Sequence, residues 1–121
     1  MYSARVVRVV DGDTLDVDIE IGFNLTLRER VRLYGINAPE TRSSDKIEKS
    51  KGMLAENFLV ETLLSAQNQC KLDIHGSGKF GRPLADVYVD GINVNLLLIK
   101  KGHAVAYFGG KGNNFFSVDL Y

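Results

Sequence analysis

The feature that most constrains the fold is a strict alternation of apolar and charged side chains early in the chain. Along residues 14–21, one parity carries the apolar residues Leu15, Val17, Ile19 and Ile21, and the other carries Asp16, Asp18 and Glu20. Successive side chains of a β-strand point to opposite faces, so this period of two predicts a strand with one buried face.

The alternation resumes after a short turn. Along residues 25–36, one parity carries Leu25, Leu27, Val31 and Leu33, and the other carries Thr26, Arg28, Arg30 and Arg32. Gly22-Phe23-Asn24 supplies the turn, so the two segments predict a long β-hairpin. Ahead of it, the valine-rich residues 5–10 end at the turn dipeptide Asp11-Gly12, which predicts a third strand in an antiparallel meander.

The segment after the meander predicts a loop and a helix. Residues 42–51 contain four basic residues, two acidic residues and three serines, and we expect a solvated loop there. Residues 53–66 place apolar side chains at helical spacing, which predicts one amphipathic helix.

The last third of the chain predicts two strands and a second helix. Residues 71–75 and 84–89 are short strand candidates separated by a glycine-rich turn. Asn93 is expected to cap a helix over residues 94–101, and Gly102 is expected to end it.

Five short strands with a helix after the third predict a mainly β fold with two helices. We expect a five-stranded Greek-key barrel of the oligonucleotide/oligosaccharide-binding (OB) type, because closing a barrel removes exposed strand edges. An open antiparallel sheet with two helices on one face is the alternative. Residues 1–121 are expected to form one domain, and residues 109–121, which lack helical periodicity, are expected to be a tail.

Composition excludes several kinds of site. The 15 Lys and Arg residues balance the 15 Asp and Glu residues, so any polyanion must be bound by a local site rather than by a general positive field. Cys70 is the only cysteine, which excludes an internal disulfide and a cysteine-based zinc site. We interpret Cys70 as a core residue, and His75 and His103 as structural residues.

No membrane partner is expected. No apolar run approaches the roughly 18 residues of a membrane span, and the first residues carry charges where a signal peptide needs an apolar stretch. We therefore expect a soluble, cytoplasmic protein. A mature secreted form, with its leader removed, would have the same features.

Asp13 is the first candidate for chemistry. It has the parity of Leu15 and Val17, so it falls on the apolar face, where a carboxylate needs a cation or several donors to offset its desolvation. Hydrogen bonds to turn amides are the simpler interpretation, and a metal ion is the alternative.

A second polar turn is expected to meet Asp13. Asn37-Ala38-Pro39-Glu40 ends the strand that pairs with the Asp13 strand, so the far ends of both strands should lie close together. Asp13, the Asn37 amide oxygen, a backbone carbonyl of the turn and Glu40 would then converge. Hard oxygen donors of this kind suit calcium or magnesium.

Two arginines can join this cluster, Arg32 from the strand and Arg82 from the glycine-rich turn. For each arginine alone, a solvated surface residue is the simpler interpretation. Together with a metal ion and a carboxylate, two guanidinium groups form an apparatus for hydrolysing a phosphodiester.

Five segments carry a family resemblance. VVDGDTLDV, VRLYGINAPET, the helix containing Ala55, KFGRPLADVYVDG and NVNLLLIKKGHAVAY resemble, in this order, the staphylococcal nuclease-like (thermonuclease) family over about residues 5–107. The resemblance implies an OB-type barrel with helices. It also implies a calcium-dependent endonuclease that cleaves DNA and RNA and leaves 3′-phosphate ends.

The resemblance also implies roles for individual residues. The implied catalytic residues are Arg32, Arg82 and Glu40, the last as general base or water-orienting group. The implied metal ligands are Asp13, Asn37 and, through its backbone carbonyl only, Ala38. The implied nucleotide contacts are Lys79, Phe80 and Tyr107. One calcium ion is implied, and another divalent metal stays open.

Asn37 departs from the family pattern. It stands where the family commonly has a second metal-binding aspartate, so the site has one negative charge fewer and should bind calcium more weakly. The alternative function is a catalytically weak or inactive OB-fold module that binds nucleic acid or protein, as in the tudor-staphylococcal nuclease proteins. Because Asp13, Arg32, Glu40 and Arg82 are all of the catalytic type, we favour a nuclease, and we expect a monomer acting on DNA and/or RNA.

Overall fold

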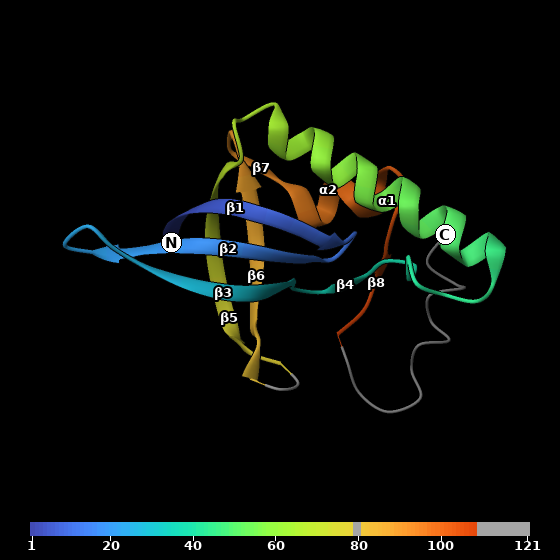
Figure 1. The fold of residues 1–121 in the computed structure, drawn as a ribbon, viewed down its shortest axis with the longest axis horizontal. Helices are drawn as coiled ribbons and strands as arrows, with labels where there is room; N and C mark the ends of the chain where they lie inside the picture. Colours follow the sequence, from blue (N-terminus) through green and yellow to red (C-terminus); the bar gives the residue numbers. More distant parts are fainter. Residues whose placement is uncertain (79–80, 109–121) are drawn as a thin grey trace.

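The structure is a computed structural model that describes residues 1–78 and 81–108. Its centre is a closed barrel of five strands: β1 (Tyr2–Asp11), β2 (Thr14–Gly22), β3 (Leu25–Leu33), β5 (Gln69–Ser77) and β6 (Pro83–Val89). Neighbouring strands follow the order β3-β2-β1-β5-β6, and a parallel pairing of β3 with β6 closes the ring (Figure 1). The predicted barrel is confirmed, and the open sheet is excluded.

Three short strands complete the described sheets. β4 (Ile36–Asn37) pairs with β8 (Val105–Ala106), and β7 (Ile92–Asn93) pairs with the end of β6. The pairing of β4 with β8 matters for the site, because it brings residues near the end of the described chain beside Asn37.

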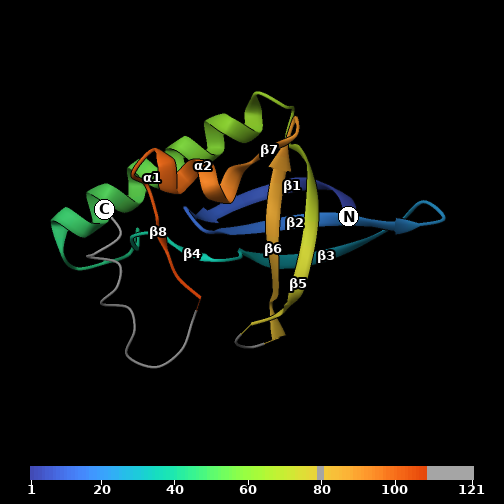
Figure 2. The ribbon, with the colours of Figure 1, turned by 180° about the vertical axis from the view of Figure 1, so that it is seen from behind.

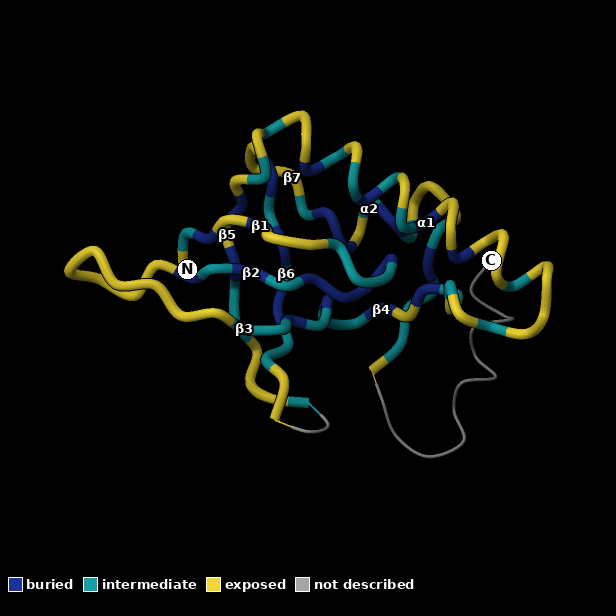
Figure 3. Tube along the Cα trace, viewed as in Figure 1, coloured by how far each residue is buried: buried dark blue, intermediate teal, exposed yellow. Residues whose placement is uncertain are grey.

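The β2–β3 hairpin forms as predicted, but only part of its apolar face is buried. Leu15, Val17 and Val31 are fully buried, whereas Ile21 and Leu25 are exposed. Their end of the hairpin projects beyond the barrel (Figures 1 and 3). The alternation therefore predicts the strands correctly, but it does not predict where the core ends.

The first helix, α1, spans Lys46–Leu64, so the loop predicted over residues 42–51 is wrong in its second half. The carboxylate of Asp45 caps the helix by accepting hydrogen bonds from the backbone N–H groups of Ile47 and Glu48. The polar residues of the first turns face solvent, while Gly52 and Ala55 are buried. The polar residues that predicted a loop here are instead the solvent-facing residues of a helix.

The second helix, α2 (Val94–Lys100), agrees with the prediction. Asn93 Oδ1 accepts a hydrogen bond from the Leu96 backbone N–H at 3.1 Å, which confirms the predicted N-cap. Gly102 follows the helix with a φ of 79°, in the left-handed region that glycine adopts without strain. Both helices lie on the same side of the barrel (Figures 1 and 2).

The core joins the barrel to both helices. Its fully buried residues include Leu15, Val17, Leu59, Leu72, Val87 and Leu98. Cys70 is buried, as predicted, and burial raises the pKa of its thiol to about 11. No helix within the described residues is both long and apolar enough to cross a bilayer.

Candidate functional site

Asp13 lies in the turn between β1 and β2 and is 6% exposed. Its Oδ2 accepts a hydrogen bond from the backbone N–H of Ala38 at 2.8 Å, and its Oδ1 accepts one from the Thr14 hydroxyl at 2.9 Å. A backbone amide is thus one partner of Asp13, but this amide belongs to the distant turn after β3. Asp13 therefore attaches that turn to the meander.

Arg32 links Asp13 to Asn37. Its Nη1 lies 3.1 Å from Asp13 Oδ2, and its Nη2 donates to Asn37 Oδ1 and to the Ile36 carbonyl, both at 3.1 Å. One guanidinium group thus has a carboxylate, an amide and a carbonyl oxygen around it. Asp13 and Asn37 therefore share Arg32 as a partner, together with the Ile36 carbonyl of β4, while the predicted role of Asp13, Asn37 and a turn carbonyl as metal ligands stays a prediction.

The oxygen atoms in this cluster suit a hard cation. Carboxylate, amide and backbone carbonyl oxygens are the ligands that calcium takes in proteins. The oxygens of Asp13, Ile36 and Asn37 already surround a positively charged group. The donor set therefore fits the metal that the family resemblance implies.

Hydrogen bonds from neighbouring elements hold the backbone around Glu40 in place. The Thr41 hydroxyl donates to Asp11 Oδ1 at 2.6 Å, and the Glu40 N–H donates to Glu48 Oε2 at 3.3 Å. Glu48 Oε1 in turn accepts a hydrogen bond from the Ser43 hydroxyl at 3.0 Å. Helix α1 and strand β1 therefore both hold the loop that carries Glu40.

The side chain of Glu40 forms no hydrogen bond or ion pair with the Asp13–Arg32 cluster in the described residues. The residue is exposed, and within residues 1–78 and 81–108 its carboxylate makes no hydrogen bond or ion pair. The predicted convergence of this carboxylate with Asp13 therefore stays a prediction. The structure leaves the carboxylate accessible to solvent.

Two glycines, Gly12 and Gly52, let helix α1 approach the site; Gly12 was predicted only as a turn residue, and Gly52 was not singled out from the sequence. A Cβ added to Gly52 would lie 2.7 Å from the Pro39 carbonyl oxygen and 2.8 Å from the Glu40 carbonyl carbon. A Cβ added to Gly12 would lie 2.7 Å from the Ala55 Cβ. A glycine inside a helix normally costs stability, so Gly52 was a signal of close backbone packing.

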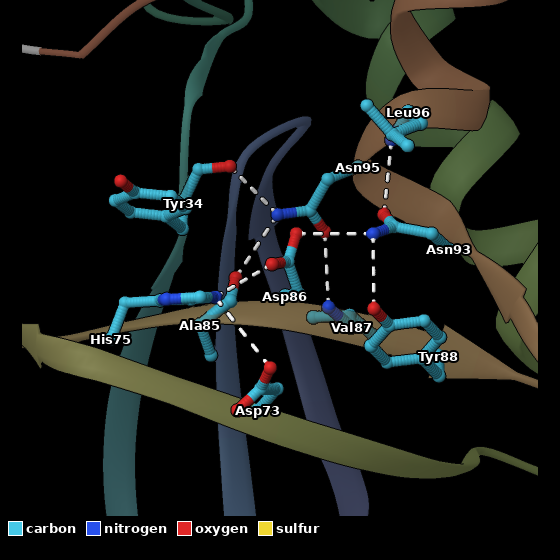
Figure 4. Close-up of polar contacts among 10 residues, drawn as sticks. All are labelled: Tyr34, Asp73, His75, Ala85, Asp86, Val87, Tyr88, Asn93, Asn95 and Leu96. Carbon is cyan, nitrogen blue, oxygen red and sulfur yellow. Dashed lines mark hydrogen bonds and ion pairs between the residues drawn. The ribbon is translucent and has the colours of Figure 1, made fainter.

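Asn95 fixes the segment that leads into the site and is 1% exposed. Its Oδ1 accepts a hydrogen bond from the Val87 N–H at 3.1 Å, and its Nδ2 donates to the carbonyls of Tyr34 and Ala85 at 2.9 and 3.0 Å (Figure 4). Helix α2 thereby holds Tyr34, three residues before Asn37, against strand β6. The sequence analysis missed this residue as well.

For the remaining predicted site residues, the structure gives backbone contacts only or no description. Arg82 is exposed just before β6, and its carbonyl accepts a hydrogen bond from the Gly78 N–H at 2.7 Å. Leu84, two residues later, is the cross-strand partner of Arg32. The backbone N–H of Tyr107 donates to the Gly35 carbonyl at 2.8 Å, close to Asn37 in the chain. Lys79 and Phe80, like the tail predicted over residues 109–121, lie outside the described residues.

A cleft of about 880 Å³ borders the cluster. Asn37, Ala38 and Glu40 line it on one side, and the first half of α1 and residues 102–105 line it on the other. Asp13, Arg32 and Arg82 are not among its lining residues. The Asp13–Arg32 cluster therefore lies at the edge of the cleft rather than inside it.

The sequence of this chain matches a known family model over most of its length. The model, described as "Staphylococcal nuclease homologue", matches residues 30–117. This chain belongs to the staphylococcal nuclease family. The family consists of nuclease-type enzymes, and the closed barrel with two helices agrees with this membership.

Several curated relatives of this chain carry nuclease names. The chain is 35% identical over 106 residues to the thermonuclease of Staphylococcus intermedius, covering 88% of this chain and 60% of the relative. It is 35% identical over 105 residues to an uncharacterized endonuclease of Haemophilus influenzae, covering 87% of this chain and 52% of the relative. An uncharacterized endonuclease of Escherichia coli O157:H7 is 34% identical over 104 residues, covering 85% of this chain and 60% of the relative. The chain thus spans between half and two-thirds of the length of these three relatives.

Proposed function

We propose that this chain is a calcium-dependent endonuclease that hydrolyses phosphodiester bonds of DNA and/or RNA and leaves 3′-phosphate ends. The observation that carries the proposal is the meeting of Asp13, Arg32 and Asn37, in a chain of the staphylococcal nuclease family. The names of the relatives, thermonuclease and endonuclease, support a nucleic acid substrate. We further propose that residues 1–121 form one domain that acts as a monomer.

The metal would be held by oxygen atoms at the edge of the cleft. We assign the carboxylate of Asp13, the amide oxygen of Asn37 and the backbone carbonyl of Ala38 as its protein ligands. A bound calcium ion would supply Lewis-acid polarisation of a phosphoryl oxygen. Because Asn37 is neutral, Asp13 would be the only charged side chain among these ligands.

Arg32 and Arg82 would bind the phosphate. Guanidinium groups donate paired, charge-assisted hydrogen bonds to phosphate oxygens, and they stabilise the charge that develops as the phosphorus centre is attacked. The contacts of Arg32 with Asp13 and Asn37, two of the proposed metal ligands, support this role, because they hold the guanidinium group beside the proposed metal position.

Glu40 would act on the attacking water. Its carboxylate is exposed while its backbone is held by Glu48, so it can accept a proton from a water molecule without first breaking an ion pair to a described residue. The water oxygen would bond to phosphorus as its proton passes to Glu40, and the bond from phosphorus to the 5′ oxygen would break. That oxygen would take up a proton from solvent, and Glu40 would later release its proton to solvent. The phosphate then remains on the 3′ side.

Lys79, Phe80 and Tyr107 are proposed to bind the substrate. A lysine ammonium would pair with a backbone phosphate, and the faces of Phe80 and Tyr107 would stack with bases. Base stacking tolerates different sequences, which suits an enzyme without strong sequence preference.

A chelator-controlled digestion tests the proposal. Calcium should stimulate digestion of single-stranded DNA, a chelator should stop it, and the products should lose phosphate from their 3′ ends on phosphatase treatment. Glu40→Gln and Arg82→Ala, with the native circular dichroism spectrum retained, should each slow digestion by about 100-fold or more. Digestion that is insensitive both to chelator and to these substitutions would reject the assignment.

A further inference from the structure

A second polar cluster lies on the outer face of the barrel, formed by Asp73 and His75 of β5 and Asp86 of β6. His75 Nε2 lies 2.7 Å from Asp86 Oδ2 and 3.8 Å from Asp73 Oδ2. One ligand atom from each of the three residues can be chosen so that all lie within 4.8 Å of one another (Figure 4). None of these three residues is among those proposed for catalysis.

The strand register creates an electrostatic problem at this cluster. Asp73 and Asp86 are direct cross-strand partners in the antiparallel β5–β6 pair. Like charges directly opposite each other destabilise a sheet. A cation shared by the two carboxylates would offset this repulsion, and His75 places a nitrogen ligand beside both.

Residues outside the cluster hold two of its side chains in place. The His75 ring is stacked on Tyr34, with ring centroids 4.2 Å apart and an interplanar angle of 19°. Asp86 Oδ1 accepts a hydrogen bond from Asn93 Nδ2 at 3.2 Å, which leaves Oδ2 directed at His75. Supporting contacts of this kind orient the ligands of metal sites.

We propose that Asp73, His75 and Asp86 bind a divalent transition metal ion of the zinc class. One imidazole nitrogen with two carboxylate oxygens suits zinc, cobalt or manganese, whereas calcium takes oxygen ligands only. Metal–ligand bonds of about 2.0 to 2.2 Å place neighbouring ligand atoms roughly 3 to 3.5 Å apart. The observed separations of 2.7 and 3.8 Å lie on either side of that range, so small side-chain rotations complete the site.

The ion would fasten β5 to β6. Two of its ligands come from β5 and the third comes from β6, and its two positive charges would balance the two carboxylates. Because the ion would bind only the folded chain, it would also stabilise the fold. The proposed nuclease activity does not enter this inference.

Calorimetric titration of zinc into the zinc-free full chain tests the proposal. Calcium is kept saturating throughout so that zinc does not bind at Asp13. One zinc ion per chain should bind, and His75→Gln and Asp86→Asn should each weaken binding by at least about tenfold. His103→Gln is the matched control, because it removes the other histidine, whose ring packs against Phe58, and should leave zinc affinity unchanged.

A second measurement needs no substitution. In nuclear magnetic resonance spectra of the wild-type chain, zinc should shift the ring signals of His75 and leave those of His103 in place. Absence of zinc binding to the wild type, unchanged binding in His75→Gln, or a shift confined to His103 would each overturn the proposal. Zinc binding that persists in Asp13→Asn would support it and would separate this site from the proposed calcium site.

Discussion

The carboxylate of Asp13 lies 3.1 Å from the guanidinium of Arg32. The two residues meet because Thr14 and Arg32 are cross-strand partners in the β2–β3 hairpin. A shift of this register by one residue would turn Arg32 toward the core and Val31 toward solvent, because neighbouring residues point to opposite faces. The burial of Val31 therefore fixes the position of Arg32 as well.

Asn37→Asp should tighten calcium binding. The substitution adds a negative charge to the proposed ligand set, and the affinity of a calcium site increases with ligand charge. The new carboxylate would also attract Arg32, which donates to Asn37 at 3.1 Å, so part of the gain is offset. Calcium titration by calorimetry measures the result, and equal or weaker affinity would contradict our account of this position.

Gly52→Ala should destabilise the fold and slow digestion. Helix propensity alone predicts a gain of about 1 kcal/mol, but the new Cβ would lie 2.7 Å from the Pro39 carbonyl oxygen. The backbone of Pro39 and Glu40 must therefore move. Urea denaturation and DNA digestion would measure both effects.

The control for Gly52→Ala is Asn57→Ala, an exposed position in the same helix. It should gain a few tenths of a kcal/mol from helix propensity and keep full activity. A Gly52→Ala protein that is stabilised and fully active would show that the close packing of α1 does not position Glu40.

Asn95→Ala should lower the free energy of unfolding by roughly 2 to 3 kcal/mol, because it removes the three hydrogen bonds of a buried side chain, to the Val87 N–H and to the carbonyls of Tyr34 and Ala85. Asn95→Asp keeps the size but places an acceptor against the carbonyls of Tyr34 and Ala85, so it should cost at least as much. Urea denaturation measures both. Changes within about 0.5 kcal/mol of the wild type would exclude a structural role for this network.

Acid should weaken the hairpin through Asp16. A hydrogen bond from Arg30 holds the pKa of the Asp16 carboxyl below its usual value of 3.8. A lowered folded-state pKa contributes stability above the unfolded pKa, and this contribution is lost as the pH falls through the folded value. Because the pair is still partly exposed to solvent, which screens the interaction, its contribution should be under about 1 kcal/mol.

Urea denaturation at about pH 6 and about pH 3 measures this effect. Asp16→Asn should lose less stability between the two pH values than the wild type. Glu20→Gln, an exposed change on the same strand, serves as the control and should follow the wild type. An equal pH dependence in Asp16→Asn and the wild type would contradict the assignment.

The sequence predicts the meander and the burial of Asp13 because a period of two specifies a strand and its faces. It does not predict where the hairpin leaves the barrel, since Ile21 and Leu25 continue the pattern although both side chains are exposed. The start of α1 was predictable in principle. Asp45 followed three residues later by Glu48 resembles the capping pattern of a helix N-terminus, and the structure uses Asp45 as the cap.

Contacts that depend on register and close packing could not be predicted. Asp73 and Asp86 meet only because β5 and β6 pair in one register, and that pairing is irregular between Ile74 and Ser77. The closeness of Gly52 to Glu40 depends on how α1 packs on the loop. These are tertiary relationships, and local residue patterns do not contain them.

The calcium dependence of DNA digestion in Asp13→Asn tests the central claim most directly. Digestion of single-stranded DNA is measured across calcium concentrations for the wild type and the variant, after the variant is shown to be folded. If Asp13 is the charged ligand of the catalytic metal, the variant should require at least about tenfold more calcium for half-maximal activity or lose activity altogether. The same calcium dependence and the same maximal rate in both proteins would contradict the claim.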